Sequence, residues 1–134
     1  MQDYFRMTMQ EREIRAISNL GLAHMGDAVY ELLVRAWLCT QGGKTSHGLH
    51  KAAVSHVSAP AQACVARQIF PQLTEEEQAV FKRGRNARVN ATPQGASPEE
   101  YHAATGLEAL FGYLYLKGET DRIGEIFALA IGDS

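Results

Sequence analysis

LGLAHMGDAVYELLVRAWL, residues 20–38, is the stretch that decides the fold class of this sequence. Its apolar residues recur every three or four positions, as they do on the buried face of an α-helix. They are Leu22, Met25, Val29, Leu32, Leu33, Ala36 and Trp37. Two residues do not suit such a helix: Gly26 weakens a helix interior by roughly 0.5–1 kcal/mol, and the acid Asp27 follows it directly. Because glycine has no side chain, we expect another helix or a substrate to approach closely at Gly26.

Helix signals continue along most of the chain. Thr74-Glu75-Glu76-Glu77 and Ser97-Pro98-Glu99-Glu100 have the pattern of capping boxes, each of which starts a helix. Gly42-Gly43 and Gly118 are stop signals. The helices are expected at about 11–18, 20–40, 48–70, 75–87, 98–117 and 119–131, with a break or a fresh start at Pro60. Strand patterns are weak, so the sequence predicts an all-α fold.

The bulk composition suits one globular unit. The chain has 134 residues, of which 46% are hydrophobic, and we expect a single domain over 1–134 with an N-terminal extension at 1–17. Cys39 and Cys64 are isolated, which predicts two small core residues rather than a disulfide framework or a zinc site. No signal-peptide pattern is present, and no apolar run approaches the ~18 residues of a membrane helix. We therefore expect a soluble cytoplasmic protein.

Glu108 occupies an unusual place in the expected helix at 98–117. At 100° per residue it falls on the stripe that should face the core. That stripe consists of Tyr101, Ala104, Glu108, Phe111 and Tyr115. A buried carboxylate needs a cation, a hydrogen-bond network or a raised pKa. The plainer interpretation is a buried salt bridge, with Arg35 or Arg67 as the partner.

Asp27 offers another interpretation of Glu108. Two helices each place an acid at or beside an apolar face, and both acids adjoin small residues that let helix backbones approach closely. Two carboxylates in one crevice repel each other unless a divalent cation lies between them, and oxygen ligands suit Mg²⁺ or Mn²⁺. The sequence thus favours a metal centre held by Asp27 and Glu108, with Glu31 as a candidate outer contact.

Histidines suggest a competing metal, but only weakly. His47, His50 and His56 lie close together, yet the sequence has no H-E-x-x-H and no acid beside them, so a zinc site is disfavoured. The sequence also lacks a P-loop, a G-x-S-x-G and a G-x-G-x-x-G, which argues against nucleotide-binding folds and nucleophile-elbow hydrolases.

The basic segment KRGRNAR, residues 82–88, is the candidate nucleic-acid contact. Residues 44–93 hold seven Lys or Arg and three acids, a local charge of +4, and the remainder is at −6 because the whole chain is at −2. Such asymmetry is typical of a phosphate-binding face, and the absence of interleaved aromatic residues favours duplex over single-stranded RNA. The predicted RNA-binding residues are Lys82, Arg83, Arg85, Asn86 and Arg88, with His50 and Lys51 as weaker candidates.

Three motifs carry a resemblance to a known family. MGDAV, residues 25–29, resembles the L-G-D-A-V core of the ribonuclease III signature, and LEALFGYLYL, residues 107–116, resembles its second motif, D-x-x-E-A-L-I-G. With GRNA at 84–87, the chain is similar from about 18 to 131 to the Mini-ribonuclease III branch of the ribonuclease III family, which lacks the double-stranded-RNA-binding domain.

The resemblance implies a helical-bundle endonuclease domain that forms a homodimer and cuts double-stranded RNA with Mg²⁺ by phosphodiester hydrolysis, leaving 5′-phosphate and 3′-hydroxyl ends. Members of the Mini branch mature the ends of large-subunit ribosomal RNA precursors, so a ribosomal protein is a candidate partner. By position, Asp27 matches the catalytic, metal-holding aspartate and Glu108 the metal-binding glutamate. Three further acids of the full-length family are replaced by Leu20, Ala23 and Thr105.

The missing acids keep other functions open. A non-cleaving RNA-binding dimer on the same fold would bind duplex RNA without Mg²⁺-dependent cutting. A helical nucleotide pyrophosphatase would need more clustered acids, typically E-x-x-E pairs, than this chain shows away from Glu75–Glu77. A purely structural helical dimer predicts that Glu108→Gln is neutral or stabilising, with no change in any RNA activity.

Overall fold

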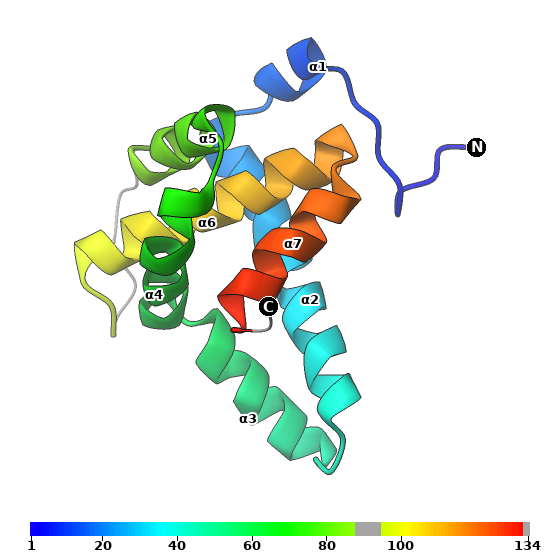
Figure 1. Cartoon of the computed structure of the whole chain (residues 1–134), viewed down its shortest axis with the longest axis vertical. Coiled ribbons are helices and arrows are strands. Elements are labelled where there is room, and N and C mark those ends of the chain that lie inside the picture. Colours follow the sequence, from blue (N-terminus) through cyan, green and yellow to red (C-terminus); the bar gives the residue numbers. More distant parts are fainter. Residues whose placement is uncertain (88–94, 133–134) are drawn as a thin grey trace.

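The computed structural model describes residues 1–87 and 95–132, and within these ranges the ordered elements are all helical (Figure 1). They are α1 (Glu11–Arg15), α2 (Asn19–Gln41), α3 (Ser46–Val57), α4 (Ala59–Ile69), the 3-10 helix η1 (Phe70–Gln72), α5 (Glu75–Arg85), α6 (Pro98–Lys117) and α7 (Thr120–Ala130). The prediction of an all-α fold is confirmed. No helix in the described ranges is both long enough and apolar enough to cross a bilayer.

Helix α6 is the centre of the bundle. It packs against α2, α4, α5 and α7, and α1 lies against its C-terminal half (Figure 1). Its residues are buried without interruption from Ala109 to Leu114, a run that takes in every side of the helix, and Leu110 and Phe111 have no exposed surface. The expectation of one core-facing stripe on α6 was therefore too narrow, because neighbouring helices surround α6 instead of covering one face.

The predicted helix starts at residues 74 and 97 are confirmed as capping boxes. The Glu77 amide donates to Thr74 Oγ1 at 3.1 Å, and the Thr74 amide donates to Glu77 Oε1 at 2.9 Å. Ser97 and Glu100 make the same reciprocal pair at 3.1 and 2.9 Å. These bonds satisfy backbone N–H groups that a helix leaves free at its first turn.

The expected helix at 48–70 is two helices that meet at Ser58. The Ser58 side chain accepts from the Ala61 amide at 3.4 Å and caps α4. Pro60 lies in the first turn of α4, where its missing N–H removes no helical hydrogen bond. The predicted break is thus confirmed, and it turns the chain so that α4 packs alongside α6 (Figure 1).

Several side chains that the periodicity placed in the core lie outside it. Cys39 and Cys64 are exposed, so their prediction as core residues was wrong. Helix α4 buries the face of Gln62, Ala66 and Ile69, which leaves Cys64 pointing outward. On α2, Leu32 is 56% exposed, because the buried residues Gly26, Tyr30 and Val34 lie on the opposite side of this helix.

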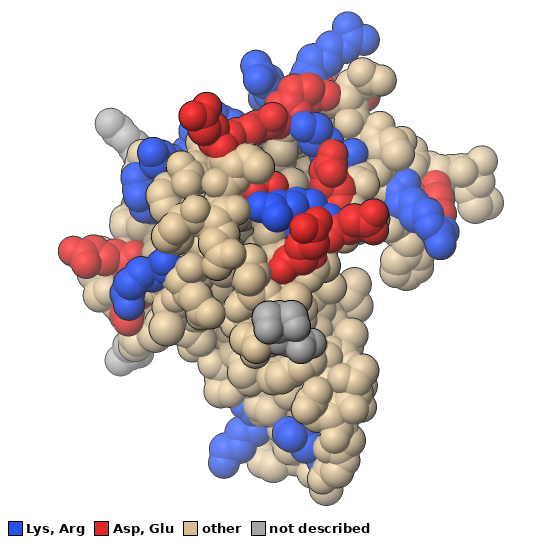
Figure 2. Space-filling model, in the orientation of Figure 1, with Lys and Arg blue, Asp and Glu red and all other residues tan. Residues whose placement is uncertain are grey.

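A polar cluster ties α1 to the bundle. The Tyr113 hydroxyl on α6 contacts the carboxylates of Glu11 on α1 and Glu76 on α5. Lys117 Nζ donates to Glu76 Oε1 at 2.9 Å and to the Tyr113 hydroxyl at 3.1 Å. Acidic and basic side chains are correspondingly interspersed over the α1 and α5 end of the face in Figure 2.

Candidate metal centre

Helices α2 and α6 touch through two glycines. A Cβ atom on Gly26 would overlap the backbone carbonyl oxygen of Glu108, and a Cβ atom on Gly112 would overlap that of Leu22. Neither position therefore accepts a side chain without separation of the helices. This confirms the expectation that Gly26 clears space for another helix, which is α6.

The glycine contact places Asp27 beside Glu108. Asp27 is exposed, and Glu108 is half-buried on the facing turn of α6. Burial raises the pKa of Glu108 to about 8, and the charge of the nearby Asp27 carboxylate acts in the same direction. The acid retains its proton at neutral pH when no cation neutralises the pair.

No Lys or Arg within the described residues forms an ion pair with Glu108. The salt-bridge interpretation with Arg35 or Arg67 was therefore wrong. Arg35 instead pairs with Glu31 one helical turn away, at 2.6 Å between Nη2 and Oε2. The two residues are four positions apart on one helix, which explains this pairing. The carboxylate of Glu31, the candidate outer contact of the metal, is thus paired with Arg35.

Gln62 is a third polar residue at the site, and sequence reasoning missed it. Its side chain on α4 is 2% exposed, and Nε2 donates to Glu108 Oε2 at 3.4 Å. A signal for it exists: Gln62 shares the buried face of α4 with Ala66 and Ile69, so it is the same kind of misplaced polar residue as Glu108.

The basic segment lies against the part of α6 that carries Glu108. Gly84 on α5 is buried, and a Cβ atom there would lie 2.6 Å from the Cβ of Ala109 and 3.1 Å from the Cα of Gly106. The described cations and amide at this helix end are Lys82, Arg83, Arg85 and Asn86, of which Arg85 is half-buried. Arg88 lies outside the described residues.

The chain matches known proteins over most of its length. Residues 20–119 match the Ribonuclease III domain. The chain belongs to the ribonuclease III family. It is 47% identical over 111 residues to the Mini-ribonuclease 3 of Symbiobacterium thermophilum, covering 83% of this chain and 85% of the relative. It is 45% identical over 134 residues to that of Brevibacillus brevis, covering 94% and 100%.

The fold agrees with this membership. A crystal structure of a protein from Fusobacterium nucleatum has a TM-score of 0.81 at 34% identity, covering 89% of this chain and 91% of that one. The predicted resemblance to Mini-ribonuclease III and the predicted class of enzyme, a ribonuclease III-type endoribonuclease, are confirmed. This identification sets aside the nucleotide pyrophosphatase.

The ribonuclease III family generally uses Mg²⁺, and the residues present fit such a cation. Two carboxylates that repel each other without a counter-charge supply hard oxygen ligands, and the buried Oε1 of Gln62 has no hydrogen-bond partner among the described residues. Those residues contain no group of three or more His, Cys, Asp or Glu that could hold a metal. Within the described residues, the candidate centre therefore has two carboxylates, those of Asp27 and Glu108.

The positions where full-length ribonuclease III carries further acids supply no metal ligand here. Leu20 is 41% exposed and Ala23 is buried against the bundle. The Thr105 side chain is buried, and its hydroxyl donates to the Tyr101 carbonyl oxygen at 2.9 Å, within its own helix. None of the three residues carries a charge that could substitute for the missing acids.

The weaker RNA-binding candidates lie apart from the basic segment. His50 and Lys51 are exposed on α3, at the opposite end of the molecule from α5 (Figure 1). Residues 42–58 contain no acid, and over α3 the face in Figure 2 shows basic side chains without acidic ones. The structure thus separates the predicted RNA-binding residues into two basic patches.

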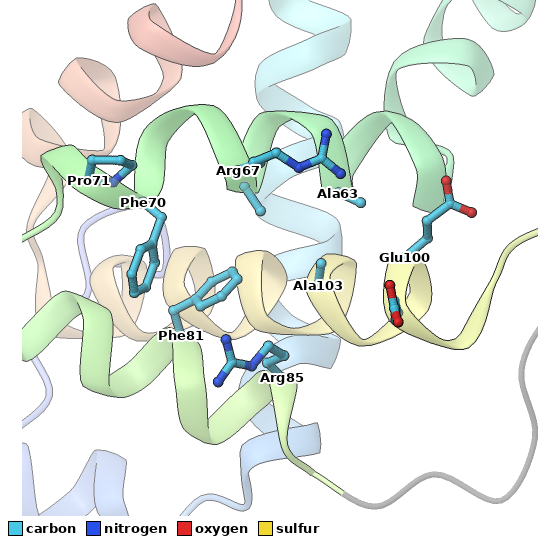
Figure 3. A pocket seen from close by; sticks show the side chains of 10 residues that line it. Ala63, Arg67, Phe70, Pro71, Phe81, Arg85, Glu100 and Ala103 are labelled. Carbon is cyan, nitrogen blue, oxygen red and sulfur yellow. The ribbon is translucent and has the colours of Figure 1, made fainter.

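A pocket of about 360 Å³ lies between α4, α5 and α6 (Figure 3). Phe81 and Ala103 form part of its apolar wall, and Arg67, Arg85 and Glu100 lie around it. Neither acid of the candidate metal centre lines this pocket, so this hollow and the candidate chemistry are at different places.

Proposed function

We propose that this protein is a Mg²⁺-dependent endoribonuclease that cleaves double-stranded RNA by phosphodiester hydrolysis. The observation that carries the proposal is the pair Asp27 and Glu108, brought together at the glycine contact in a chain of the ribonuclease III family. The products are RNA ends with a 5′-phosphate and a 3′-hydroxyl.

The two acids have different surroundings and therefore different roles. Both would hold the cation, which supplies a bound water of lowered pKa and stabilises charge on the phosphate. Asp27 is exposed, so it faces the solvent from which RNA arrives and orients the attacking water. Glu108 is half-buried and hydrogen-bonded to Gln62, so its carboxylate has a fixed direction. Mn²⁺ suits the same oxygen ligands.

The RNA backbone would be held by the two basic patches. Lys82, Arg83, Arg85 and Asn86 supply cations and an amide at the end of α5, the helix that packs against α6 through Gly84, and Arg88 continues the same segment. His50 and Lys51 form the second patch. Charged contacts to phosphates give affinity without sequence preference, as a shape-reading duplex nuclease requires. Among natural substrates we propose the ends of large-subunit ribosomal RNA precursors, with a ribosomal protein as an accessory partner.

We further propose a homodimer that offers one metal centre to each strand of the duplex. An exposed apolar strip along α2 supports it. Ala28, Leu32 and Ala36 follow one another at four-residue spacing, and all three are exposed. A second copy of the chain that covers this strip would remove apolar surface from water.

The decisive experiment compares Asp27→Asn with the wild type on a long RNA duplex, with and without Mg²⁺, followed by mapping of the ends. The wild type should cut only with Mg²⁺, and the variant should fold and bind the duplex without cutting it. Asp121→Asn, at an exposed acid on α7, is the matched control and should cut normally. Full cleavage by Asp27→Asn would refute the proposal.

A non-cleaving RNA-binding dimer is the second candidate, and the number of acids favours it. Among the described residues, Asp27 and Glu108 are the acids at the centre, and they are fewer than the acids of the full-length family. Duplex binding by the wild type with no Mg²⁺-dependent products would support this candidate instead.

A further inference from the structure

Gln62 differs from the other buried polar side chains of the described chain. Thr105 donates to a carbonyl of its own helix, and Glu77 is paired with Arg122 through two bonds of 2.9 Å. Gln62 is more buried than either, yet its Oε1 atom has no hydrogen-bond partner among the described residues. Polar atoms left in this state in a protein interior are uncommon and call for an explanation.

The orientation of the Gln62 amide is determined by its neighbours. Its nitrogen, Nε2, lies 2.9 Å from the backbone carbonyl oxygen of Val57 and 3.4 Å from Glu108 Oε2. Both neighbours are acceptors, so they match the two hydrogens of the amide nitrogen. A rotated amide would set its oxygen against the Val57 carbonyl. The free atom is therefore the oxygen, an acceptor with no donor among the described residues.

A bound divalent cation would bring the missing donor. Mg²⁺ bound by one or two carboxylates keeps several waters, and each of these waters is a hydrogen-bond donor. The Gln62 amide nitrogen already contacts Glu108, and the amide oxygen Oε1 is bonded to the same carbon as that nitrogen. The oxygen therefore lies close to the Glu108 carboxylate, a proposed ligand of the cation. The surroundings of metal ligands usually include such partners, which orient the ligand and bind metal waters.

We propose that Gln62 is a positioning residue of the metal centre: Nε2 holds the Glu108 carboxylate in place, and Oε1 accepts a hydrogen bond from a water on the cation. This inference rests on the proposed function. It explains how a centre with Leu20, Ala23 and Thr105 in place of acids is completed. A neutral amide adds a polar contact without adding a third negative charge to the pair Asp27 and Glu108.

The test replaces Gln62 with methionine, which has nearly the same shape and removes the donor and the acceptor. The readout is the dissociation constant of Mn²⁺ for the metal-free protein, measured by calorimetry. We expect it to rise by about 10- to 100-fold. The thermal midpoint of the metal-free protein should stay within about 5 °C of the wild type, because the unpartnered oxygen leaves together with the hydrogen bonds of the amide nitrogen.

Gln78→Met is the matched control. Gln78 Nε2 also donates to two backbone carbonyls, those of Phe70 at 3.1 Å and Leu73 at 3.5 Å, but it touches no acid among the described residues. The Mn²⁺ dissociation constant of this variant should equal that of the wild type. At saturating metal, the KM of the Gln62 variant for duplex RNA should also be unchanged.

A purely structural role for Gln62 predicts the opposite pattern. The thermal midpoint would then fall while the Mn²⁺ dissociation constant stayed the same, and that result would overturn the inference. Gln62→Leu repeats the measurement with a second side chain, and failure of both variants to fold would also overturn it. Wild-type protein that neither binds Mn²⁺ nor cuts RNA would instead refute the proposed function.

Discussion

Gly26 and Gly112 hold α2 and α6 in backbone contact. The position of a Cβ atom on Gly26 lies 2.8 Å from the Gly112 amide nitrogen, and that of a Cβ atom on Gly112 lies 3.0 Å from the Gly26 amide nitrogen. The contact is reciprocal, and Asp27 and Glu108 lie together next to it. The candidate metal centre therefore depends on two residues that have no side chain.

Gly26→Ala should unfold the protein or destabilise it by more than about 3 kcal/mol, because its methyl group would meet backbone rather than a movable side chain. Gly124→Ala on α7 is the matched change, since a Cβ atom there meets nothing within 4 Å. We expect it to stabilise the protein by about 0.5–1 kcal/mol through helix propensity. Thermal unfolding of both variants measures the difference, and equal effects would contradict the glycine contact.

The stability of the metal-free protein should fall as the pH rises from about 4.5 to about 8. Glu108 has a higher pKa in the folded state than the ordinary 4.5 of an unfolded chain, so the folded state keeps a proton that unfolding releases. The stabilisation that Glu108 contributes is fully present below the unfolded-state pKa of 4.5. It is lost as the pH rises through the folded-state pKa of about 8.

Glu108→Gln should remove this dependence and gain stability relative to the wild type at pH 8. Urea unfolding at several pH values, in the presence of a chelator, measures the slope. Glu119→Gln, at an exposed acid before α7, should keep the wild-type slope. Parallel curves for the wild type and Glu108→Gln would show that Glu108 does not titrate in this way.

Neutralising Lys82 and Arg83, by substitution with glutamine, should weaken duplex binding and leave the rate at saturating RNA unchanged. Each cation that no longer binds a phosphate should lower the slope of log K against log salt by about 1. Arg6→Gln is the charge control, because Arg6 is exposed and paired with Asp3 at 3.1 Å. Binding titrations at three salt concentrations measure the slope, and a value equal to that of the control would remove this segment from the interface. Lys51→Gln tests the second patch in the same way.

Leu32→Glu should convert the proposed dimer into a monomer, because a charge in the apolar strip of α2 would be buried without a partner. Light scattering coupled to size exclusion measures the mass. Phe5→Glu is the control, since Phe5 is 79% exposed and lies outside α2. A wild type that is already monomeric at micromolar concentration would contradict the proposed dimer.

Local signals predicted the helices well, and the reason is visible at their ends. The boxes at Thr74 and Ser97 and the break at Pro60 act within one turn of chain, so no distant residue is needed to recognise them. Burial was harder to predict. Periodicity assumes a helix with one covered face, whereas α6 is covered around its circumference and α2 leaves Leu32 outside.

The candidate centre was predicted in part. Asp27 and Glu108 could be paired from the sequence because each is a charge in an apolar helix beside small residues. Gln62 carries no charge and lies in no motif, so only its position on the buried face of α4 distinguished it. The two basic patches lie at opposite ends of the molecule because of where α3 and α5 pack in the fold. No local sequence pattern encodes that placement.

The glycine contact also bears on which cations the centre accepts. Backbone atoms set the separation of the two helices there, so the space between the acids cannot widen as it could if flexible side chains lay between them. Ca²⁺ needs more ligands at longer distances than Mg²⁺, and it prefers adaptable sites. We therefore expect this centre to discriminate by ionic radius: Ca²⁺ should compete poorly with Mg²⁺, and the rigidity of the helix pair, rather than the number of acids, should set the selectivity.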